Sequence, residues 1–405
     1  MAGPPLRLFA LLAACAVLGP LQLNVYLPSL PLVQQEFDAD VAGVQWTVSL
    51  AMAAFGLGLV LLGPLSDHHG RRPVLIGGLA LFTIMSAAAA LAPSLEVLAG
   101  ARMLQSVGAS IAFITARGVV ADLSPREQLQ RSVAQLTMIM LMGQMVAPLI
   151  GNLAMTVGGW RTTQGGLAVA GAVLTLSVFA RLRETRVQAV EAATGAAPSG
   201  VPALLAPTVE LLSRGGFRLQ LLQIGLLYSA YPAFVSIAPH LMIDVFHRPA
   251  TEYAYYFALL PLGYFSGNAL VLRFGRRVGA SRLIGTGAVG AFVSALLGAG
   301  LLGAGWWHPL ALFVPAGLLL NLSLGLALPS ATARVVTQSW PATASGWGLA
   351  GFMQQLTGAC AVQVLGFFPS ATPFPVLMLC ASLAVVPLLL ERRLGAASPP
   401  SPAPG

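Results

Sequence analysis

The chain has 405 residues, of which 57% are hydrophobic and only 8% are charged, and its mean hydropathy is +0.81. Soluble domains carry roughly 25% charged residues, so this composition excludes a soluble globular protein and indicates a chain that lies in lipid. The net charge of +8 would suggest a nucleic-acid partner in a soluble chain, but here the arginines fall between long apolar runs and no such partner is expected.

Apolar runs bounded by Gly, Pro or charged residues predict twelve membrane-spanning helices, because about 20 apolar residues of helix cross a bilayer. The first run is expected to be an uncleaved span rather than a signal peptide, since it continues through Gln22 and Asn24 to Pro28. The sequence therefore predicts an all-α integral membrane protein. The expected spans are 8–29, 44–64, 74–92, 95–121, 132–157, 165–182, 217–239, 251–272, 282–303, 309–333, 345–367 and 373–390.

One polar connector divides these spans into two sets of six. It predicts an N-terminal six-helix bundle over 1–182, a cytoplasmic linker over 183–216 and a C-terminal six-helix bundle over 217–392. The tail 393–405 consists largely of Gly, Ala, Ser and Pro and is expected to be disordered.

The distribution of arginines predicts the orientation. All 21 basic residues are Arg, and with the N-terminus in the cytoplasm 17 of them fall on the cytoplasmic side. The other face keeps only Arg161 and Arg248, while Arg102 and Arg117 lie within a span. Positive charge favours the cytoplasmic side of a membrane, so both termini are expected inside a cell inner membrane.

A short basic loop joins the second and third expected spans. Residues 63–72 read Gly-Pro-Leu-Ser-Asp-His-His-Gly-Arg-Arg. The pattern resembles the loop 2–3 signature of the major facilitator superfamily and implies a transporter that works by alternating access. Gly70-Arg71-Arg72 recurs 205 residues later as Gly275-Arg276-Arg277, a repeat typical of two-bundle transporters. The second copy carries Leu272 where the first has Asp67.

Asp67, Arg71 and Asp122 are predicted to form a conformational latch at the inner membrane face. A carboxylate at the inner end of the second helix can face the positive N-terminal end of a neighbouring helix. Arg71 can pair with Asp67, and with Asp122 where the fourth span leaves the membrane. The alternative is that these charges only set topology, which is the role expected of Arg72.

The fourth span carries an arginine inside the membrane. Arg102 lies about 10 Å from the span start at Ser94 or Leu95, and burying an arginine in lipid is costly. We therefore expect it to face a wet cavity or a partner, with Gln105, three residues on, sharing its face. The alternative is that Arg102 snorkels to the outer interface.

The fifth span contains Gly143, Pro148 and Gly151. Small residues allow close helix approach and Pro148 bends the helix. The segment resembles the antiporter signature of drug exporters, which implies a hinge at the bundle interface. Simple helix packing is the alternative interpretation.

Four further segments narrow the resemblance: 18–31, 325–333, 344–354 and Arg117-Gly-Val-Val-Ala-Asp122. They look like the bicyclomycin-resistance-type (Bcr/CflA) branch of the twelve-span drug:proton antiporters. The resemblance implies export of small amphipathic compounds in exchange for protons. The chain departs from this branch at Asn24, where relatives commonly carry Asp, and at Ser106, where Gly is usual.

The acidic residues do not identify a proton carrier. A proton-coupled exporter needs a group that titrates inside its cavity. Glu96 and Glu252 are expected at outer span ends, and Asp67 and Asp122 at inner ones, so no carboxylate is expected at mid-membrane. Proton coupling is therefore implied by the resemblance alone, and Asp122, Asp67, Glu96 and His240 remain alternative carriers.

An apolar pocket with a few polar groups suits amphipathic molecules. Each aromatic residue can equally serve packing or interface anchoring. The residues predicted to line the substrate cavity are Asn24, Arg102, Gln105, Tyr228, Tyr231 and Gln354.

The expected function is that of a monomeric transporter rather than an enzyme. No cofactor, nucleotide or metal is expected, because the chain has neither a Gly-x-x-x-x-Gly-Lys-Ser/Thr pattern nor a metal-ligand spacing. The cysteines, Cys15, Cys360 and Cys380, lie in apolar runs and are interpreted as reduced thiols. Two alternatives remain, a carrier for a single metabolite working by uniport or with another ion, and a transporter-derived sensor that binds without translocating.

Overall fold

The computed structural model describes residues 5–62, 69–124, 126–185, 201–249, 252–340, 342–368, 381 and 385–391, and within that part every regular element is helical. Asp67, most of the expected twelfth span and the tail 393–405 lie outside the described residues. Nine of the described helices are long and apolar enough to cross a membrane.

The N-terminal helices follow the expected spans closely, because long apolar runs fix both helix and burial. They are α1 Leu6–Tyr26, the 3₁₀ turn η1 Leu27–Ser29, α2 Leu30–Glu36, α3 Val41–Leu61, α5 Arg71–Ala90, α6 Leu95–Leu123 and α7 Arg126–Arg181. Helix α7 covers both the fifth and the sixth expected spans. It bends where Gly158 and Gly159 leave helical geometry, and Gly159 has a φ of +74°, which favours glycine.

The remaining helices depart from expectation in the connector. Helix α9 forms within the predicted linker 183–216, which was expected to be only a polar connector; its apolar residues and the absence of Gly inside it allow a helix. The helices are α9 Val201–Ser213, α10 Gly215–Asp244, α11 Tyr253–Val278, α12 Ala280–Gly303, α13 Pro309–Ala311, the π-helical turn η3 Leu312–Gly317, α14 Leu318–Gln338 and α15 Thr343–Gly366.

Packing divides the chain into two compact units. Unit 1 contains Met1–Ala206, Val235–Ala258 and Val362–Ser370, and unit 2 contains Pro207–Phe234, Leu259–Ala361 and Ala371–Gly405. Within unit 1 the last part of α10 and the end of α15 pack with the N-terminal helices.

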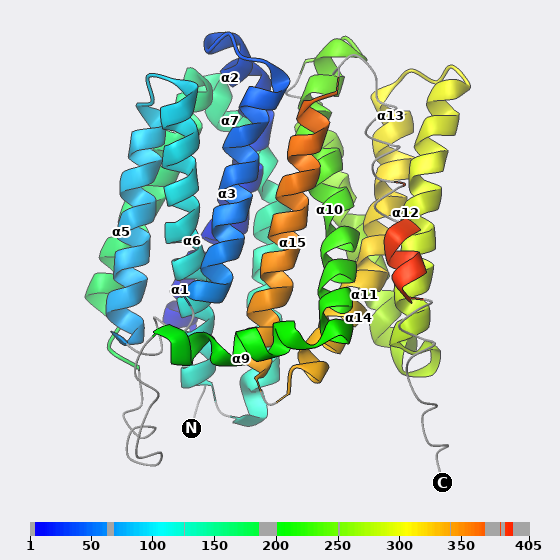
Figure 1. Cartoon of the computed structure of the whole chain (residues 1–405). Coiled ribbons are helices and arrows are strands. Elements are labelled where there is room, and N and C mark those ends of the chain that lie inside the picture. Colours follow the sequence, from blue (N-terminus) through cyan, green and yellow to red (C-terminus); the bar gives the residue numbers. More distant parts are fainter. Residues whose placement is uncertain are drawn as a thin grey trace. The chain divides into compact units, whose positions relative to one another are not determined.

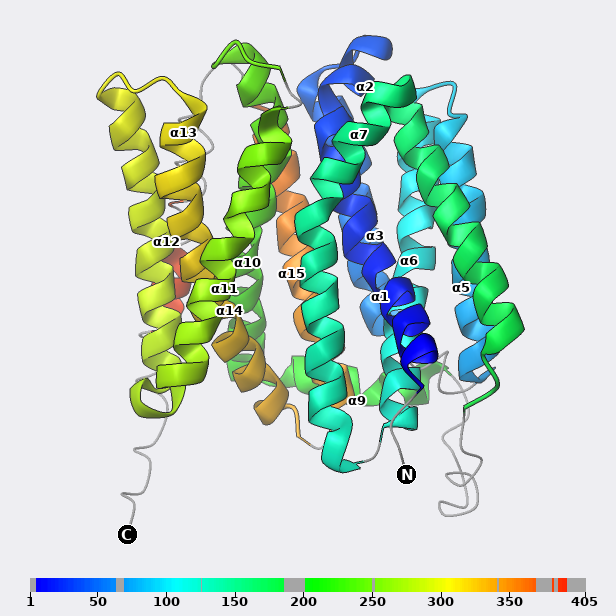
Figure 2. The ribbon, with the colours of Figure 1, turned by 180° about the vertical axis from the view of Figure 1, so that it is seen from behind.

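Unit 1 is built around α6, which packs against α1, α3 and α5, while α7 packs against α1 and α5. Figure 1 shows α3, α5 and α6 side by side, and Figure 2 shows α1 beside α7. Leu12, Phe55, Leu79, Phe82 and Val119 belong to its buried core. Helices α5 and α6 touch at Gly108, where a Cβ atom would lie 2.5 Å from the backbone nitrogen of Phe82.

Unit 2 packs α12 against α14, and α11 against α14 through small residues. A Cβ on Gly267 of α11 would collide with the Leu322 carbonyl oxygen, and one on Gly325 with that of Tyr264. Close backbone approach of this kind is typical of helices that associate in lipid. Large apolar side chains, including Ile84, Leu153, Leu176 and Leu272, are exposed on the helices, as a lipid environment permits.

Candidate functional site

The arginine-rich end of unit 1 brings Arg71 and Asp122 together. The Arg71 Nε atom lies 3.0 Å from Asp122 Oδ2. Arg71 crosses α6 at Gly118, where a Cβ atom would lie 2.7 Å from the guanidinium carbon. Gly118 and Asp122 are four residues apart on one face of α6, so the glycine makes room and the carboxylate pairs with the arginine. Asp67, the third residue of the predicted latch, lies outside the described residues.

A second carboxylate holds the start of α5. Glu184, just beyond α7, accepts hydrogen bonds from the backbone N–H groups of Arg71, at 2.9 Å, and Arg72, at 3.2 Å. The preceding Gly70 has a φ of +94°, which suits glycine and turns the chain into the helix. A carboxylate at this position satisfies orphan N–H groups and complements the positive end of the helix dipole.

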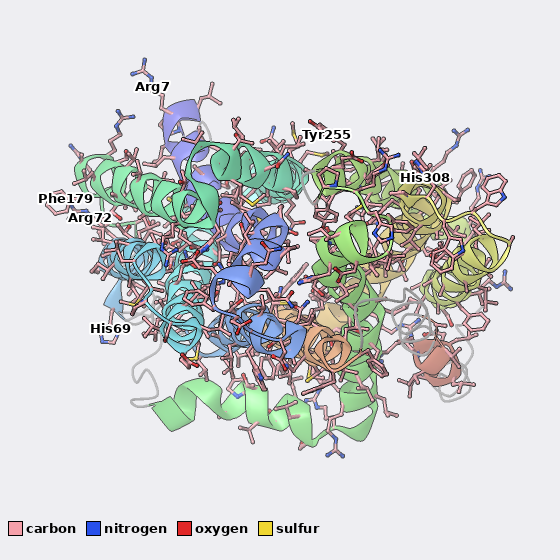
Figure 3. All side chains as sticks on the ribbon, turned by 90° about the horizontal axis from the view of Figure 1, so that it is seen from above. Arg7, His69, Arg72, Phe179, Tyr255 and His308 are labelled. Atoms are coloured by element: carbon pink, nitrogen blue, oxygen red, sulfur yellow. The ribbon has the colours of Figure 1, made fainter. Side chains whose placement is uncertain are left out.

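Arg72 binds the end of α7. Its Nη2 atom donates a 2.8 Å hydrogen bond to the Phe179 carbonyl oxygen, and its guanidinium carbon lies 5.4 Å from the centre of the Phe179 ring. Figure 3 shows these two side chains next to each other at the edge of unit 1. Arg72 thus ties α5 to α7, in addition to any role in topology.

Arg102 is fully buried between α1 and α3. Its Nε donates to the Thr47 carbonyl oxygen at 3.2 Å, and the guanidinium carbon lies 3.7 Å from the centre of the Tyr26 ring. The Tyr26 hydroxyl is 3.0 Å from Thr47 Oγ1. Neither Nη atom of Arg102 has an acceptor among the described residues. In this conformation the side chain lines no open surface and is stabilised by the aromatic face.

The other predicted cavity residues of unit 1 have neighbours of their own. Gln105 Nε2 donates to Ser86 of α5 and Gln164 of α7, whereas the polar partner of Arg102 lies on α3. The Asn24 amide, nearly buried, donates to the Pro20 carbonyl oxygen one turn earlier in α1 at 2.8 Å. Both side chains are therefore buried within unit 1, where Gln105 links neighbouring helices and Asn24 bonds to its own helix.

The predicted hinge residues lie where α7 approaches α1. A Cβ on Gly143 would press on Val17, and one on Gly151 would collide with the Val25 carbonyl oxygen. Pro148, between them, is buried. The two glycines therefore allow close packing of α7 on α1.

The predicted cavity residues of unit 2 are partly buried. Tyr228 and Tyr231 lie on α10, and Gln354 lies on α15. Tyr228 makes a polar contact with Gln355, the neighbour of Gln354. This part of unit 2 therefore combines aromatic rings with amide groups.

A family model described as Major Facilitator Superfamily matches residues 12–362. The chain belongs to the major facilitator superfamily. It is therefore an integral membrane transporter of small molecules and not an enzyme.

Relatives extend this finding at modest identity. An uncharacterized MFS-type transporter, YdgK of Bacillus subtilis, is 27% identical over 96% of each chain. Multidrug resistance protein D of Escherichia coli is 30% identical over 44% of this chain and 46% of its own. Multidrug resistance protein MdtL of Escherichia coli is 29% identical over 61% of each chain.

Solved structures agree in fold. The xylose transporter XylE of Escherichia coli, in a partially occluded inward-open conformation, superposes with a TM-score of 0.73 at 12% identity, over 97% of this chain and 99% of its own. A D-xylose-proton symporter gives a TM-score of 0.76 at 12% identity, over 96% and 97%. At such identity these structures show a shared fold and nothing beyond it.

Unit 2 of this transporter contains a carboxylate cluster that was not predicted. Glu391 accepts hydrogen bonds from both terminal nitrogens of Arg334, at 2.8 and 2.9 Å, from Gln223 Nε2 at 2.8 Å, and from the Ser281 hydroxyl. Burial alone would raise the pKa of Glu391, but its hydrogen bonds from Arg334, Ser281 and Gln223 hold that pKa below its ordinary value. In the sequence Glu391 is only a charge after the last expected span.

A second unpredicted feature lies in unit 1, at the helix ends opposite the arginine-rich loop. Four hydrogen bonds join α2 and α3 to the last part of α10 and the end of α15. Only one of the four bonds involves a residue that the sequence analysis named, His240; hydrophobic periodicity and composition do not identify the other partners. We call this set the polar seam; its residues are Gln34, Ala42, Gln45, Ser49, Ser236, His240 and Gln363.

Proposed function

We propose that this transporter exports small amphipathic organic compounds, drugs among them, in exchange for protons. It works by alternating access in the cell inner membrane, with both termini in the cytoplasm. The relatives named as multidrug resistance proteins support the substrate class. The motifs that resemble the Bcr/CflA branch support the same assignment and supply the argument for antiport.

The observation that carries the substrate class is the neutrality of the buried polar groups. In the described part of the chain these are almost all amides and hydroxyls; the exceptions are the guanidinium of Arg102, the imidazole of His240 and the carboxylate of Glu391. Glu391 follows the expected twelfth span, so among the described residues no buried carboxylate lies inside an expected span, where it could bind a cationic metabolite. A neutral polar interior suits compounds that bind through apolar area and a few hydrogen bonds.

The assignment of Arg71 and Asp122 to a latch belongs to this proposal. The pair joins the start of α5 to the end of α6, and Glu184 holds the same helix start. A latch that closes the arginine-rich end must break when that end opens. The charges are only partly buried, with 17% and 26% of the two side chains exposed, so water can replace the pair at modest cost.

Transport in vesicles tests the function. Purified protein is reconstituted into proteoliposomes, and ethidium or chloramphenicol is added outside the vesicles. A pH gradient is then imposed across the membrane. We expect the gradient to drive accumulation of at least one compound, with matching proton movement reported by a trapped pH dye. Vesicles that carry Arg71→Gln at matched protein level serve as the control. Absence of movement for a broad panel of amphipathic compounds would contradict drug export.

A carrier without proton coupling is the second candidate, and Asn24 favours it. Its amide cannot carry a proton, and its side chain is bonded to the backbone of its own helix. If coupling was lost with the carboxylate of the relatives, transport is insensitive to the pH gradient and Asn24→Asp creates a pH dependence. Full drive by the gradient in the unmodified protein excludes this candidate.

A further inference from the structure

The last part of α10 contains a buried imidazole that no described residue fully satisfies. His240 is 2% exposed, and its neighbours in sequence Ala238, Leu241 and Met242 are buried as well. Its Nε2 atom is 2.9 Å from Gln34 Oε1 on α2. Its Nδ1 atom is buried and has no hydrogen-bond partner among the described residues.

The Gln34 contact fixes which nitrogen carries the hydrogen. An amide oxygen only accepts, so Nε2 donates to it, and in the neutral imidazole Nδ1 then presents a bare lone pair. Nδ1 is therefore the position at which a proton would add. In the closed arrangement that new N–H group would meet no acceptor from the described chain.

The bond belongs to the polar seam, whose other members do not titrate. Gln45 Nε2 donates to the Ser236 carbonyl oxygen at 3.3 Å. Ser49 donates to Gln363 Oε1 at 2.9 Å, and Gln363 Nε2 donates to the Ala42 carbonyl oxygen at 3.3 Å. Amides and hydroxyls stay neutral at all physiological pH values, whereas imidazole changes its charge between about pH 5 and 8.

Apart from Asp244, the charged groups near this end of unit 1 have partners other than His240. Asp244 lies one turn along α10 and acts on His240 through its charge. On the facing elements Glu36 binds Arg161 and Trp160, and Asp40 caps the start of α3 through the Gly43 N–H. In the segment after α10, Arg248 and Glu252 approach each other to 3.8 Å. Among these, only Asp244 acts electrostatically on the imidazole.

We propose that Nδ1 of His240 is a proton-binding site that controls opening of the outer side of this transporter. The seam closes only around a neutral imidazole, because a charged ring would be buried without a partner for its second N–H. Opening the seam admits water, which solvates the imidazolium. A proton and the open seam therefore favour each other, as linkage requires.

This inference rests on the proposed orientation, in which the arginine-rich ends face the cytoplasm and the seam faces outward. Outside pH is then the signal. Acid outside holds the transporter open to that side and slows its return, whereas neutral pH lets the outer side close. His240 thus regulates the return step and need not be the group that carries the coupling proton.

Distance measurement between spin labels tests the seam directly. Cys15, Cys360 and Cys380 are replaced, and nitroxide labels are attached to Leu32→Cys on α2 and Pro249→Cys after α10, both exposed positions. The protein is placed in lipid nanodiscs without substrate or gradient. Between about pH 7.5 and 5.5 we expect the population with long label distances to rise several-fold.

Variants of the two seam residues decide the cause. His240→Gln keeps a donor for Gln34 and does not titrate, so it should hold the short distance at both pH values. His247→Gln removes an exposed imidazole from the same end and should respond like the parent. Gln34→Leu should enlarge the open population at both pH values. A full pH response in His240→Gln, a flat parent, or an unchanged Gln34→Leu variant would overturn the proposal.

The measurement also separates this inference from the proposed function. Because neither drug nor gradient is present, a pH-dependent seam stands even if no compound is exported. If export is driven by protons while the seam distances stay constant, the His240 proposal fails and drug:proton antiport survives.

Discussion

The two units place a carboxylate beside the start of an equivalent helix in different ways. In unit 1, α5 begins after Gly70, with two carboxylates nearby: Glu184 takes its backbone N–H groups and Asp122 takes the Arg71 side chain. In unit 2, α12 begins after Gly279, and one carboxylate, Glu391, accepts hydrogen bonds from Ser281 of α12 and from Arg334 and Gln223. The two glycines have φ values of +94° and +82°.

This difference changes what one substitution removes. Only 7% of the Glu391 side chain is exposed, compared with 26% for Asp122. The ion pair of Glu391 is largely shielded from water, whereas water screens the interactions of the more exposed Asp122 and Glu184. The cluster of unit 2 is therefore suited to holding helices together permanently, and that of unit 1 to breaking and re-forming.

The largest effect is expected from Glu391→Gln. It leaves Arg334 largely buried without its partner, and breaking a buried ion pair costs about 3–5 kcal/mol. We expect a clear loss of thermal stability in detergent, with reduced membrane levels. Glu210→Gln, which breaks an exposed pair with Arg214 in the same unit, is the matched control and should change little. Equal melting temperatures for the two variants would show that Glu391 is not a structural centre.

The same carboxylate predicts a pH dependence. The pKa of Glu391 is below its ordinary value of 4.5, so its contribution to stability is present above pH 4.5 and is lost as pH falls through the lowered pKa. The melting temperature should therefore fall more steeply in acid for the unmodified protein than for Glu391→Gln. Parallel curves for the two proteins would contradict this linkage.

Substitution of the unit 1 pair should affect transport more than stability. Asp122→Asn removes the negative charge that pairs with Arg71 but keeps one acceptor oxygen, and the pair is partly exposed to water, so we expect a stability cost of about 1 kcal/mol or less. Asp67→Asn tests the third latch residue in the same way. Drug efflux at matched membrane level should fall strongly in both. Normal efflux in either variant would remove that residue from the latch.

Hydropathy and charge predicted most of the fold and the ion pair of unit 1, but not the Glu391 cluster of unit 2. The spans follow from apolar length, and the pairing of Arg71 with Asp122 follows from the position of a loop arginine and a span-end carboxylate on the same side of the membrane. Glu184 and Glu391 were not recognised, since their partners come from helix ends distant in sequence that only tertiary packing brings together. Gln105 shows the same limit: three residues from Arg102, it meets α5 and α7, because a central helix has neighbours on every side.

Glu184→Gln should have a smaller effect than substitution of the ion pair. Glutamine can still accept from one backbone N–H of α5, but it loses the charge that complements the helix N-terminus. The expected stability cost is about 0.5–1 kcal/mol. Glu184→Ala removes both acceptors and should cost more. Hydrogen exchange of the backbone amides in the first turn of α5 measures this effect. Protection equal to that of the unmodified protein in both variants would mean that Glu184 does not cap the helix.

The smallest and most specific effect is expected from Gly118→Ala. The new methyl group would lie 2.7 Å from the Arg71 guanidinium carbon, which sits at the end of a flexible side chain and can move away. Stability should therefore change by only about 0.5 kcal/mol, because alanine also favours the helix. Arg71 can no longer reach Asp122 in the same geometry, so efflux should fall several-fold. Gly77→Ala on α5, where a Cβ meets nothing within 4 Å, is the control and should keep full activity. If both variants transport normally, contact between Arg71 and α6 is not needed, and unit 1 does not differ from unit 2 in the way described.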